Sequence, residues 1–367
     1  MDTKASSTTQ GLLQRPEDRE AIAIASRYRV SVMGCGVISP TARSADHLLD
    51  VLRAGVPHPT DTQRRLLPLD ELHAVSELRP REVKKVDRFS LLAITAARAA
   101  MREAGLEADA IARCGIVTGN MMCGWTFTEP QVRALHDPNS TSVSPYLATA
   151  WFPAAPQGQV TIHLKMQGFA KTITTDRCAG AQAIGLAFDR IRNGRSDILL
   201  AGGVEAPVTP FVEAAFGQLH QAPENLVEAA AYLLLARGDT GQIAIGAHET
   251  FPITPPDGFS DDAIEQHLSA FVRGLPEHPP VSAVICNLAA SHAAEEKIAS
   301  AVASAFQGDK PLILYPTRAI GDSLAASGAL AAAFACAALG QCEGPCSTLV
   351  LSLGHQCADL LWIYKQF

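Results

Sequence analysis

Apolar runs closed by glycine or proline recur along the chain, and they predict strands that are buried on both faces of a sheet. The first run, RVSVMGCGVISP, occupies residues 29–40. A different pattern, KTITTD at 171–176, alternates and is rich in β-branched side chains, which also favours a strand. The remaining predicted strands occupy 114–120, 197–206, 232–236, 241–248, 281–287, 311–315, 347–353 and 358–364.

Between the strands, apolar residues recur at helical spacing. The clearest case is 179–193, where they share one face and Gly194 supplies a stop. Asp87 is a candidate N-cap for a second helix at 86–106, and Gly105 lies near its end. Further helices are predicted at 44–54, 293–306 and 324–339, and proline-rich surface connections at 251–257 and 276–280.

The alternation of strands and helices is typical of an α/β protein with a mainly parallel sheet. The order of elements occurs twice, so we expect two similar halves, 28–210 and 211–367, in one compact double-lobed unit. Residues 1–27 are rich in Ser, Thr, Gln and charged side chains, and they predict a mobile leader.

Charge and composition argue against several classes of partner. The 367 residues carry a net charge of −7, and no lysine- or arginine-rich run suggests binding to nucleic acid. No apolar run reaches the roughly 18 residues that span a bilayer, and the N-terminus lacks a signal-peptide pattern. We therefore expect a cytoplasmic protein with no membrane span. The lack of a phosphate-binding glycine loop predicts no cofactor.

Nine cysteines are scattered along the chain, mostly inside apolar runs. Such residues are expected to be buried, reduced thiols. Cys342 and Cys346 form the only pair that is close in sequence, and no second pair of cysteines or histidines follows at zinc-site spacing. We therefore expect no metal site.

Five phrases, in the same order, resemble those of the β-ketoacyl synthases of fatty-acid and type II polyketide synthesis. They are MGCGVISP, SADHLLDVLRAG, VDRFSLLAITAARAAMREAGL followed by CGIVTGN, DILLAGGVEAPVTP, and GDSLAASGALAAAFACAAL. The resemblance covers the chain from about Arg29 to the C-terminus. It implies the thiolase fold, in which two similar α/β halves form a five-layered αβαβα arrangement, and it implies a dimer.

Members of that family use one cysteine and two histidines. The cysteine lies at a helix N-terminus, where peptide dipoles favour a thiolate that accepts an acyl chain. In the phrase KTITTDRCAGAQAI the position of this cysteine falls on Arg177. The two histidine positions fall on Leu288, in LAASH, and on Asp322, in RAIGD, where Arg318 replaces the family's lysine.

These three changes predict the loss of catalysis. A guanidinium stays protonated and cannot be acylated in place of a thiolate, and Leu288 and Asp322 cannot donate the hydrogen bonds of a neutral imidazole. Arg177 and Asp322 carry opposite charges at positions that converge in the family's fold. We expect them to pair, because a buried charge without a partner is costly.

Cys178, next to Arg177, leaves an alternative open. If it acts as a nucleophile, the chain is an acyltransferase or hydrolase of the same fold; otherwise Cys178 is a small buried residue. His292 is expected to cap a helix or lie at the surface rather than to replace a lost catalyst. The segment GHQCAD, 354–359, stands where the family has the loop that gates its active site.

The resemblance implies a role as a chain-length factor, the ketosynthase-like subunit of type II polyketide synthases that lacks the cysteine. Such a subunit forms a heterodimer with an active ketosynthase and shapes the tunnel for a growing acyl chain supplied by acyl carrier protein. The walls of this tunnel would come from Met121, Met122, Trp125 and Phe127, for which ordinary core packing is the alternative. The dimer strand would comprise Lys171, Thr172, Ile173, Thr174, Thr175 and Asp176.

Two departures set the chain apart from aromatic polyketide systems. Arginine replaces the glutamine that is usual at the nucleophile position, and the stretch between Gln218 and Pro280 is shortened. We therefore expect a polyene system, which includes aryl polyenes. A homodimeric module that binds an acyl chain without a ketosynthase partner is a second alternative.

Overall fold

The structure is a computed structural model of the 367-residue chain. Its description covers residues 28–55, 65–140, 142–218, 225–253, 261–277, 279–287, 292–306 and 308–365. The predicted leader, 1–27, lies outside these residues, as does Leu288. His292 begins a helix, but its side chain is not among those described.

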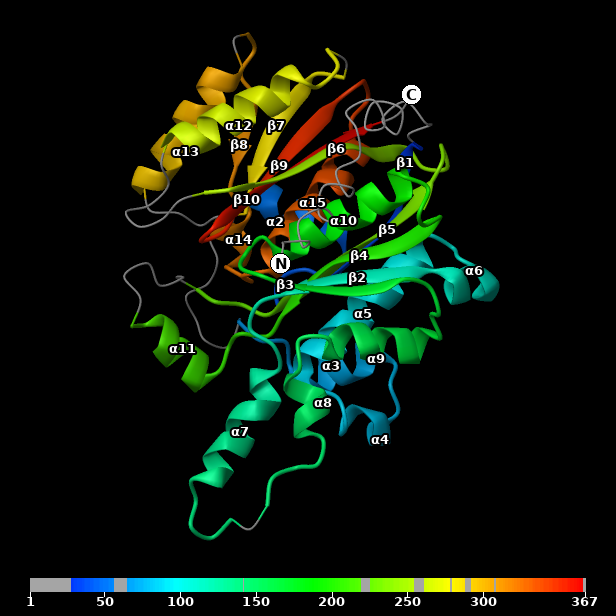
Figure 1. The fold of residues 1–367 in the computed structure, drawn as a ribbon, viewed down its shortest axis with the longest axis vertical. Helices are drawn as coiled ribbons and strands as arrows, with labels where there is room; N and C mark the ends of the chain where they lie inside the picture. The colour runs from blue at the N-terminus through cyan, green and yellow to red at the C-terminus, as the bar shows by residue number, and fades with distance from the viewer. Residues whose placement is uncertain are drawn as a thin grey trace, which may run out of the picture.

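The strands form one sheet made of two equivalent halves (Figure 1). In the first half the order is β3-β2-β4-β5-β1, and in the second it is β8-β7-β9-β10-β6, so each strand corresponds to the strand five places later. A short ladder between β1 and β6 joins the halves. The strands are β1 Val30–Ile38, β2 Gly115–Asn120, β3 Ala170–Thr174, β4 Ile198–Glu205, β5 Ala229–Arg237, β6 Ile243–Pro252, β7 Val281–Cys286, β8 Leu312–Leu314, β9 Ser347–Leu353 and β10 Cys357–Lys365.

The sheet is mixed, so the expectation of a mainly parallel sheet was wrong. The strands β2 and β7 pair in parallel with both of their neighbours, and the strands β5 and β10 pair antiparallel with both of theirs. A parallel neighbour requires a helix that crosses back over the sheet. Between β4 and β5 the helix α11, Pro210–Phe216, packs in a separate cluster instead, so β5 returns antiparallel to β4. Although β5 falls in the second of the predicted halves, it lies between β4 and β1 of the first.

Helices cover both outer faces and fill the space between the halves (Figure 1). On the first half, α5 Arg88–Glu103 and α9 Ala155–Leu164 form the outer layer, and on the second half α12 Asp261–Arg273 and α13 His292–Ala305 do so. The central layer consists of α10 Ala179–Arg192 and α15 Ala326–Gly340. The five-layered thiolase-type arrangement is therefore confirmed.

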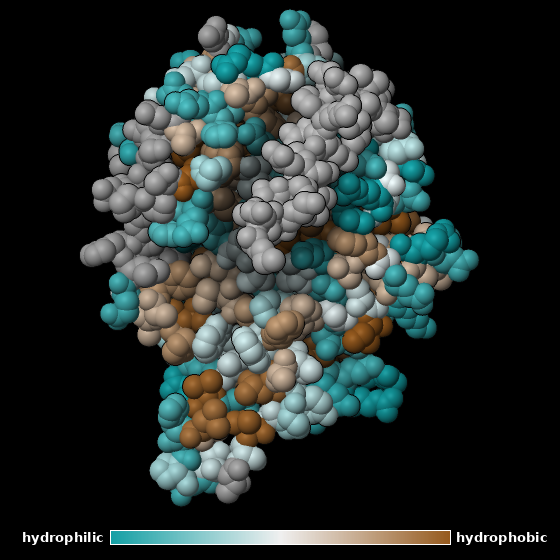
Figure 2. Space-filling view, viewed as in Figure 1, coloured by the Kyte–Doolittle hydropathy of each residue, from teal (hydrophilic) through white to brown (hydrophobic). Residues whose placement is uncertain are grey.

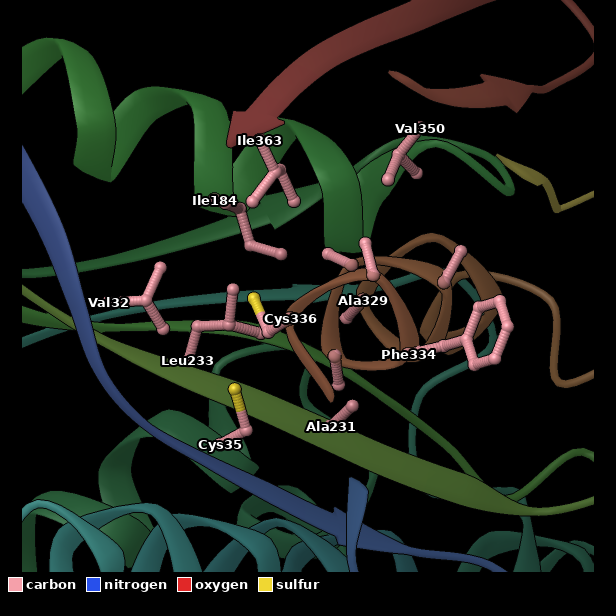
Figure 3. Packing of buried hydrophobic residues seen from close by; sticks show 14 of the residues in the cluster. Val32, Cys35, Ile184, Ala231, Leu233, Ala329, Phe334, Cys336, Val350 and Ile363 are labelled. Carbon is pink, nitrogen blue, oxygen red and sulfur yellow. The ribbon is translucent and has the colours of Figure 1, made fainter. Parts of the chain in front are cut away.

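The central layer is packed with small side chains (Figure 3). Ala329 and Cys336 of α15 meet Ala231 and Leu233 of β5 and Cys35 of β1. Because alanine and cysteine occupy little volume, two helices and two sheet halves can approach closely there.

Local signals in the sequence set the ends of several helices. Ser44 caps α2 Ala45–Ala54, and the Asp87 Oδ1 atom accepts a hydrogen bond of 2.8 Å from the backbone N–H of Phe89 at the start of α5. The Asp87 cap was predicted. Short helices complete the fold: α3 Leu69–Ser76, α4 Pro80–Val83, α6 Ala108–Arg113, α8 Leu147–Trp151 and α14 Thr317–Ile320.

The helices α7 Trp125–Leu135, α9 and α12 were not predicted. Neither were the shorter helices α3, α4, α6, α8, α11 and α14. The stretch 251–257 was expected to be a loop, but its first two residues, Phe251 and Pro252, belong to β6. Pairing with β10 extends β6 to Pro252, and a local sequence pattern does not reveal such pairing. None of the helices in the described residues combines the length and apolarity that a bilayer crossing needs.

Candidate functional site

Arg177 and Asp322 meet at the junction of the two halves. Arg177 lies directly before α10, and Asp322 lies between α14 and α15. The Arg177 Nη1 atom donates a hydrogen bond to Asp322 Oδ2. The arginine side chain is 18% exposed and the aspartate side chain 2%, so the ion pair is largely withdrawn from water. The predicted pairing is confirmed.

The chain around Asp322 is fixed by its backbone. Its N–H donates to Asn225 O at 3.0 Å, and its carbonyl accepts from Val227 N at 2.9 Å. Its second carboxylate oxygen, Oδ1, accepts from Leu324 N at 2.8 Å. Both side-chain oxygens are therefore partnered, which stabilises a buried carboxylate.

Arg318, at the position of the family's lysine, points elsewhere. It forms an ion pair with Glu295 of α13, and its guanidinium carbon lies 5.0 Å from the centre of the Tyr315 ring. The structure thus brings Arg177 and Asp322 together but does not add Arg318 to them.

Cys178 is fully buried at the N-cap of α10. Its Sγ atom lies 3.3 Å from the carbonyl oxygens of Ser352 and Cys357, to which the thiol donates. The pKa of this thiol is raised well above its ordinary value, first by a hydrogen bond with Cys357 and then by burial. A buried thiol with a raised pKa is a poor nucleophile, because the thiolate is the reactive form.

Asp176 ties this region to the segment 354–359. Its Oδ2 atom accepts from the backbone N–H groups of His355, at 2.7 Å, and Gln356, at 3.1 Å. Gly354 is required at the contact, because an added Cβ would lie 2.2 Å from the carboxylate oxygens. This segment is therefore fastened to the start of α10.

Three of the four proposed tunnel residues gather beside a small apolar cluster. Met121, Met122 and Trp125 pack against it, and the Trp125 ring stacks on Phe211 with a centroid distance of 4.5 Å. Phe127 is not among the described members of the cluster; its backbone N–H donates to Asp87 at 2.8 Å. The buried residues of the cluster are Val208, Val212, Phe216, Leu226 and Leu324. Since Leu226 and Leu324 flank Asp322, the cluster adjoins the ion pair.

Glu205, which the sequence analysis did not single out, lies fully buried at the end of β4. Its Oε1 atom accepts hydrogen bonds from the backbone N–H groups of Met121 and Met122. Burial raises the pKa of this carboxyl group to about 8, although both hydrogen bonds act in the opposite direction. The signal in the sequence was a glutamate inside an apolar run.

His248 of β6 lies between two carboxylates. Its Nε2 atom is 3.0 Å from Asp359 Oδ2, and its Nδ1 atom is 3.3 Å from Asp189 Oδ2. Burial alone lowers the pKa of His248, but the hydrogen bonds to Asp189 and Asp359 raise it to about 10. Gly185 makes room for the ring, because a Cβ there would lie 2.0 Å from Nε2. The sequence analysis missed this group.

The predicted dimer strand lies at an edge of the sheet. In the described part of the chain, β3 pairs with β2 alone, and its residues are exposed or half-buried. Large apolar side chains are exposed on neighbouring helices: Val132 and Leu135 of α7, Trp151 of α8 and Ile162 of α9. Figure 2 shows apolar surface gathered over the end of the molecule that carries α7 and α8.

Comparison with known proteins gives a consistent family. Residues 27–231, more than half of the chain, match the model of the β-ketoacyl synthase N-terminal domain. Nodulation protein E of Rhizobium leguminosarum bv. trifolii is 37% identical over 143 residues, which are 38% of this chain and 36% of that protein. The actinorhodin polyketide putative beta-ketoacyl synthase 2 of Streptomyces coelicolor is 31% identical over 145 residues, 39% of this chain and 35% of that protein. The matched region thus spans about a third of the length of these relatives.

Two solved structures share the fold. A chain from the complex of a type II polyketide-synthase acyl carrier protein with its ketosynthase bound to the hexaketide superposes with a TM-score of 0.78 at 23% identity. The ishigamide ketosynthase/chain length factor superposes with a TM-score of 0.72 at 20% identity. Each comparison covers 93% of this chain and 100% of the other.

Proposed function

Because the chain belongs to the β-ketoacyl synthase family, we propose that it is a ketosynthase-like subunit without condensing activity of its own, a chain-length factor. It works in the cytoplasm as one half of a heterodimer with an active ketosynthase. There it shapes the tunnel that receives the acyl chain delivered by acyl carrier protein.

The ion pair between Arg177 and Asp322 carries this proposal. The two residues occupy the positions that resemble those of the family's nucleophilic cysteine and one of its histidines, and they bind each other. A guanidinium engaged by a buried carboxylate offers no nucleophile for an acyl chain.

The edge strand β3 supports a partner subunit. An edge with unpaired backbone groups invites pairing with a strand of another chain, and exposed apolar side chains on α7, α8 and α9 extend the surface. Met121, Met122 and Trp125 supply the tunnel wall in this proposal, since they adjoin the ion pair. Phe127, whose backbone N–H donates to Asp87, is the fourth residue of the proposed wall.

We favour a polyene system as the setting. The arginine at position 177 and the shortened stretch between Gln218 and Pro280 depart from aromatic polyketide systems.

The competing enzyme function depends on Cys178. Its complete burial and the raised pKa of its thiol oppose acylation. Intact-mass analysis after exposure to acyl carrier protein thioesters separates the two functions. We expect no acyl adduct on this chain, and an adduct on Cys178 would favour an acyltransferase or hydrolase.

The decisive experiment is co-expression with an active ketosynthase of type II polyketide synthesis, followed by purification through a tag on this chain alone. We expect an equimolar complex. A charge at the C-terminal end of the edge strand, Thr174→Glu, should abolish retention of the ketosynthase, because Thr174 is exposed on β3. The matched control is Ser304→Glu, which adds the same charge on the exposed face of α13 in the outer layer.

Retention of the ketosynthase by Thr174→Glu at the wild-type level would refute the predicted interface. A stable homodimer that retains no ketosynthase would favour the homodimeric acyl-binding module instead. Equal melting temperatures of both variants and the wild type ensure that the result reports association rather than folding.

A further inference from the structure

Two thiols and a carboxylate converge next to the ion pair. The oxygen atoms of Asp176 and the sulfur atoms of Cys178 and Cys357 provide ligand atoms that all lie within 4.8 Å of one another. Asp176 and Cys178 immediately precede α10, whereas Cys357 begins β10, 179 positions after Cys178. Because Cys357 lies far from the other two residues in the sequence, the spacing of the cysteines does not indicate this cluster, and no metal site was expected.

Hydrogen bonds hold the three side chains in place. The Asp176 Oδ1 atom accepts from Cys178 N at 2.9 Å and from the Cys357 thiol at 3.5 Å, and the second of these contacts is the one that a cation would replace. The Gln182 Nε2 atom donates to Cys357 Sγ at 3.2 Å, and Thr175 fixes the other end of the Gln182 amide at 2.7 Å. Outer contacts of this kind orient the ligands in metal sites.

We propose that Asp176, Cys178 and Cys357 bind one divalent cation of the zinc type. Two thiolates with a carboxylate form a donor set that suits zinc, which binds sulfur at about 2.3 Å and oxygen at about 2.1 Å. Ligand atoms of a tetrahedral site then lie roughly 3.3–3.8 Å apart, so the present atoms need to move inward by about 1 Å or less. A water molecule completes the coordination on the side where Cys357 is half-exposed.

Binding replaces protons with metal bonds. Each thiol releases one proton to water, and the electron pair left on each sulfur forms a bond to the cation, with no change in oxidation state. Without the cation, burial and the contact with Cys357 keep Cys178 a neutral thiol. Affinity therefore falls as the pH falls, because protons compete for the sulfur atoms.

The cation would connect the two halves of the molecule. Its ligands come from the start of α10, which belongs to the first half, and from β10, which belongs to the second. Arg177 lies between two of them, so the same bond would also fix the backbone that carries the ion pair. The site would thus stabilise the junction rather than catalyse a reaction.

The test uses the full chain, purified under a phosphine reductant and titrated with Co²⁺ alone. We expect one cobalt ion per chain and a thiolate-to-cobalt charge-transfer absorption that excess Zn²⁺ abolishes. Cys357→Ser and Cys178→Ser should weaken cobalt binding at least tenfold. The matched control, Cys123→Ser, removes a half-buried cysteine outside the cluster and should bind as the wild type does.

A melting experiment guards against misfolded variants. Zn²⁺ should raise the melting temperature of the wild type and of Cys123→Ser but not that of Cys357→Ser, which should still unfold cooperatively. The proposal is wrong if the wild type shows no charge-transfer band, or if Cys357→Ser retains it. A Cys178–Cys357 disulfide in the untreated protein, without cobalt binding after reduction, would also overturn it. All readouts use this chain alone and are independent of any ketosynthase partner.

Discussion

A double-mutant cycle on Arg177 and Asp322 tests whether the ion pair forms in solution. Arg177→Met removes the cation while keeping an apolar stem of similar length. Asp322→Asn removes the charge but keeps an oxygen that can accept from Leu324 N. The third variant combines both changes, so that neither partner is left charged.

The structure predicts that the two single substitutions lower the free energy of unfolding by different amounts. Removing one partner of a buried ion pair costs about 3–5 kcal/mol, and partial exposure of the arginine places the loss for Arg177→Met near the lower end, about 3 kcal/mol. Asp322→Asn should cost only about 1–2 kcal/mol, because the 18% exposed Arg177 side chain can turn toward water. We expect a coupling free energy of about 2 kcal/mol between the two sites.

The measurement is urea unfolding at neutral pH, monitored by far-ultraviolet circular dichroism. The free energies of the four proteins are extrapolated with one shared dependence of the free energy of unfolding on urea concentration. The exposed pair Arg79–Glu82 provides the control cycle, for which the coupling should be much smaller because water screens the two charges. Strict additivity of the Arg177 and Asp322 variants would refute the ion pair and, with it, the main support for a non-catalytic subunit.

Three further results should follow from the buried groups. The wild type should have a higher free energy of unfolding than His248→Gln, in full below about pH 6.5 and progressively less as the pH rises toward 10, because folding raises the pKa of His248 to about 10. A difference in the free energy of unfolding that stays constant across this range would contradict the two carboxylate contacts. Glu205→Gln should leave the free energy of unfolding unchanged at pH 4 and increase it at pH 9. The buried carboxyl group of the wild type, with its pKa raised to about 8, loses its stabilising neutral form over that range. Equal pH profiles of the free energy of unfolding for both proteins, measured by chemical unfolding, would argue against a buried neutral Glu205. Gly185→Ala should destabilise the fold by about 1–3 kcal/mol, because the added methyl group overlaps the His248 ring. Gly158→Ala in α9, where the added methyl group meets open space, should stabilise the fold by about 0.5–1 kcal/mol. Comparable melting temperatures of the two variants would exclude the overlap.

The strands and the helices α2, α5, α10, α13 and α15 were accessible from the sequence because burial and periodicity are local, whereas the other helices were not predicted. The strand Ser347–Leu353 has the bounds that were predicted and is buried along its whole length, and the Asp87 cap marks the start of α5. The proposed loss of the nucleophile likewise rests only on the residue type at position 177 and the resemblance around it.

Strand direction and distant contacts were decided by the tertiary structure. The antiparallel return of β5 depends on where α11 packs, and no local pattern specifies that. The enclosure of His248 between Asp189 and Asp359, and the meeting of Cys178 with Cys357, join residues that lie far apart in the chain. A sequence pattern shows that a side chain will be buried, but its neighbours are set by the order of strands in the sheet, because that order determines which distant segments face one another across the central helices.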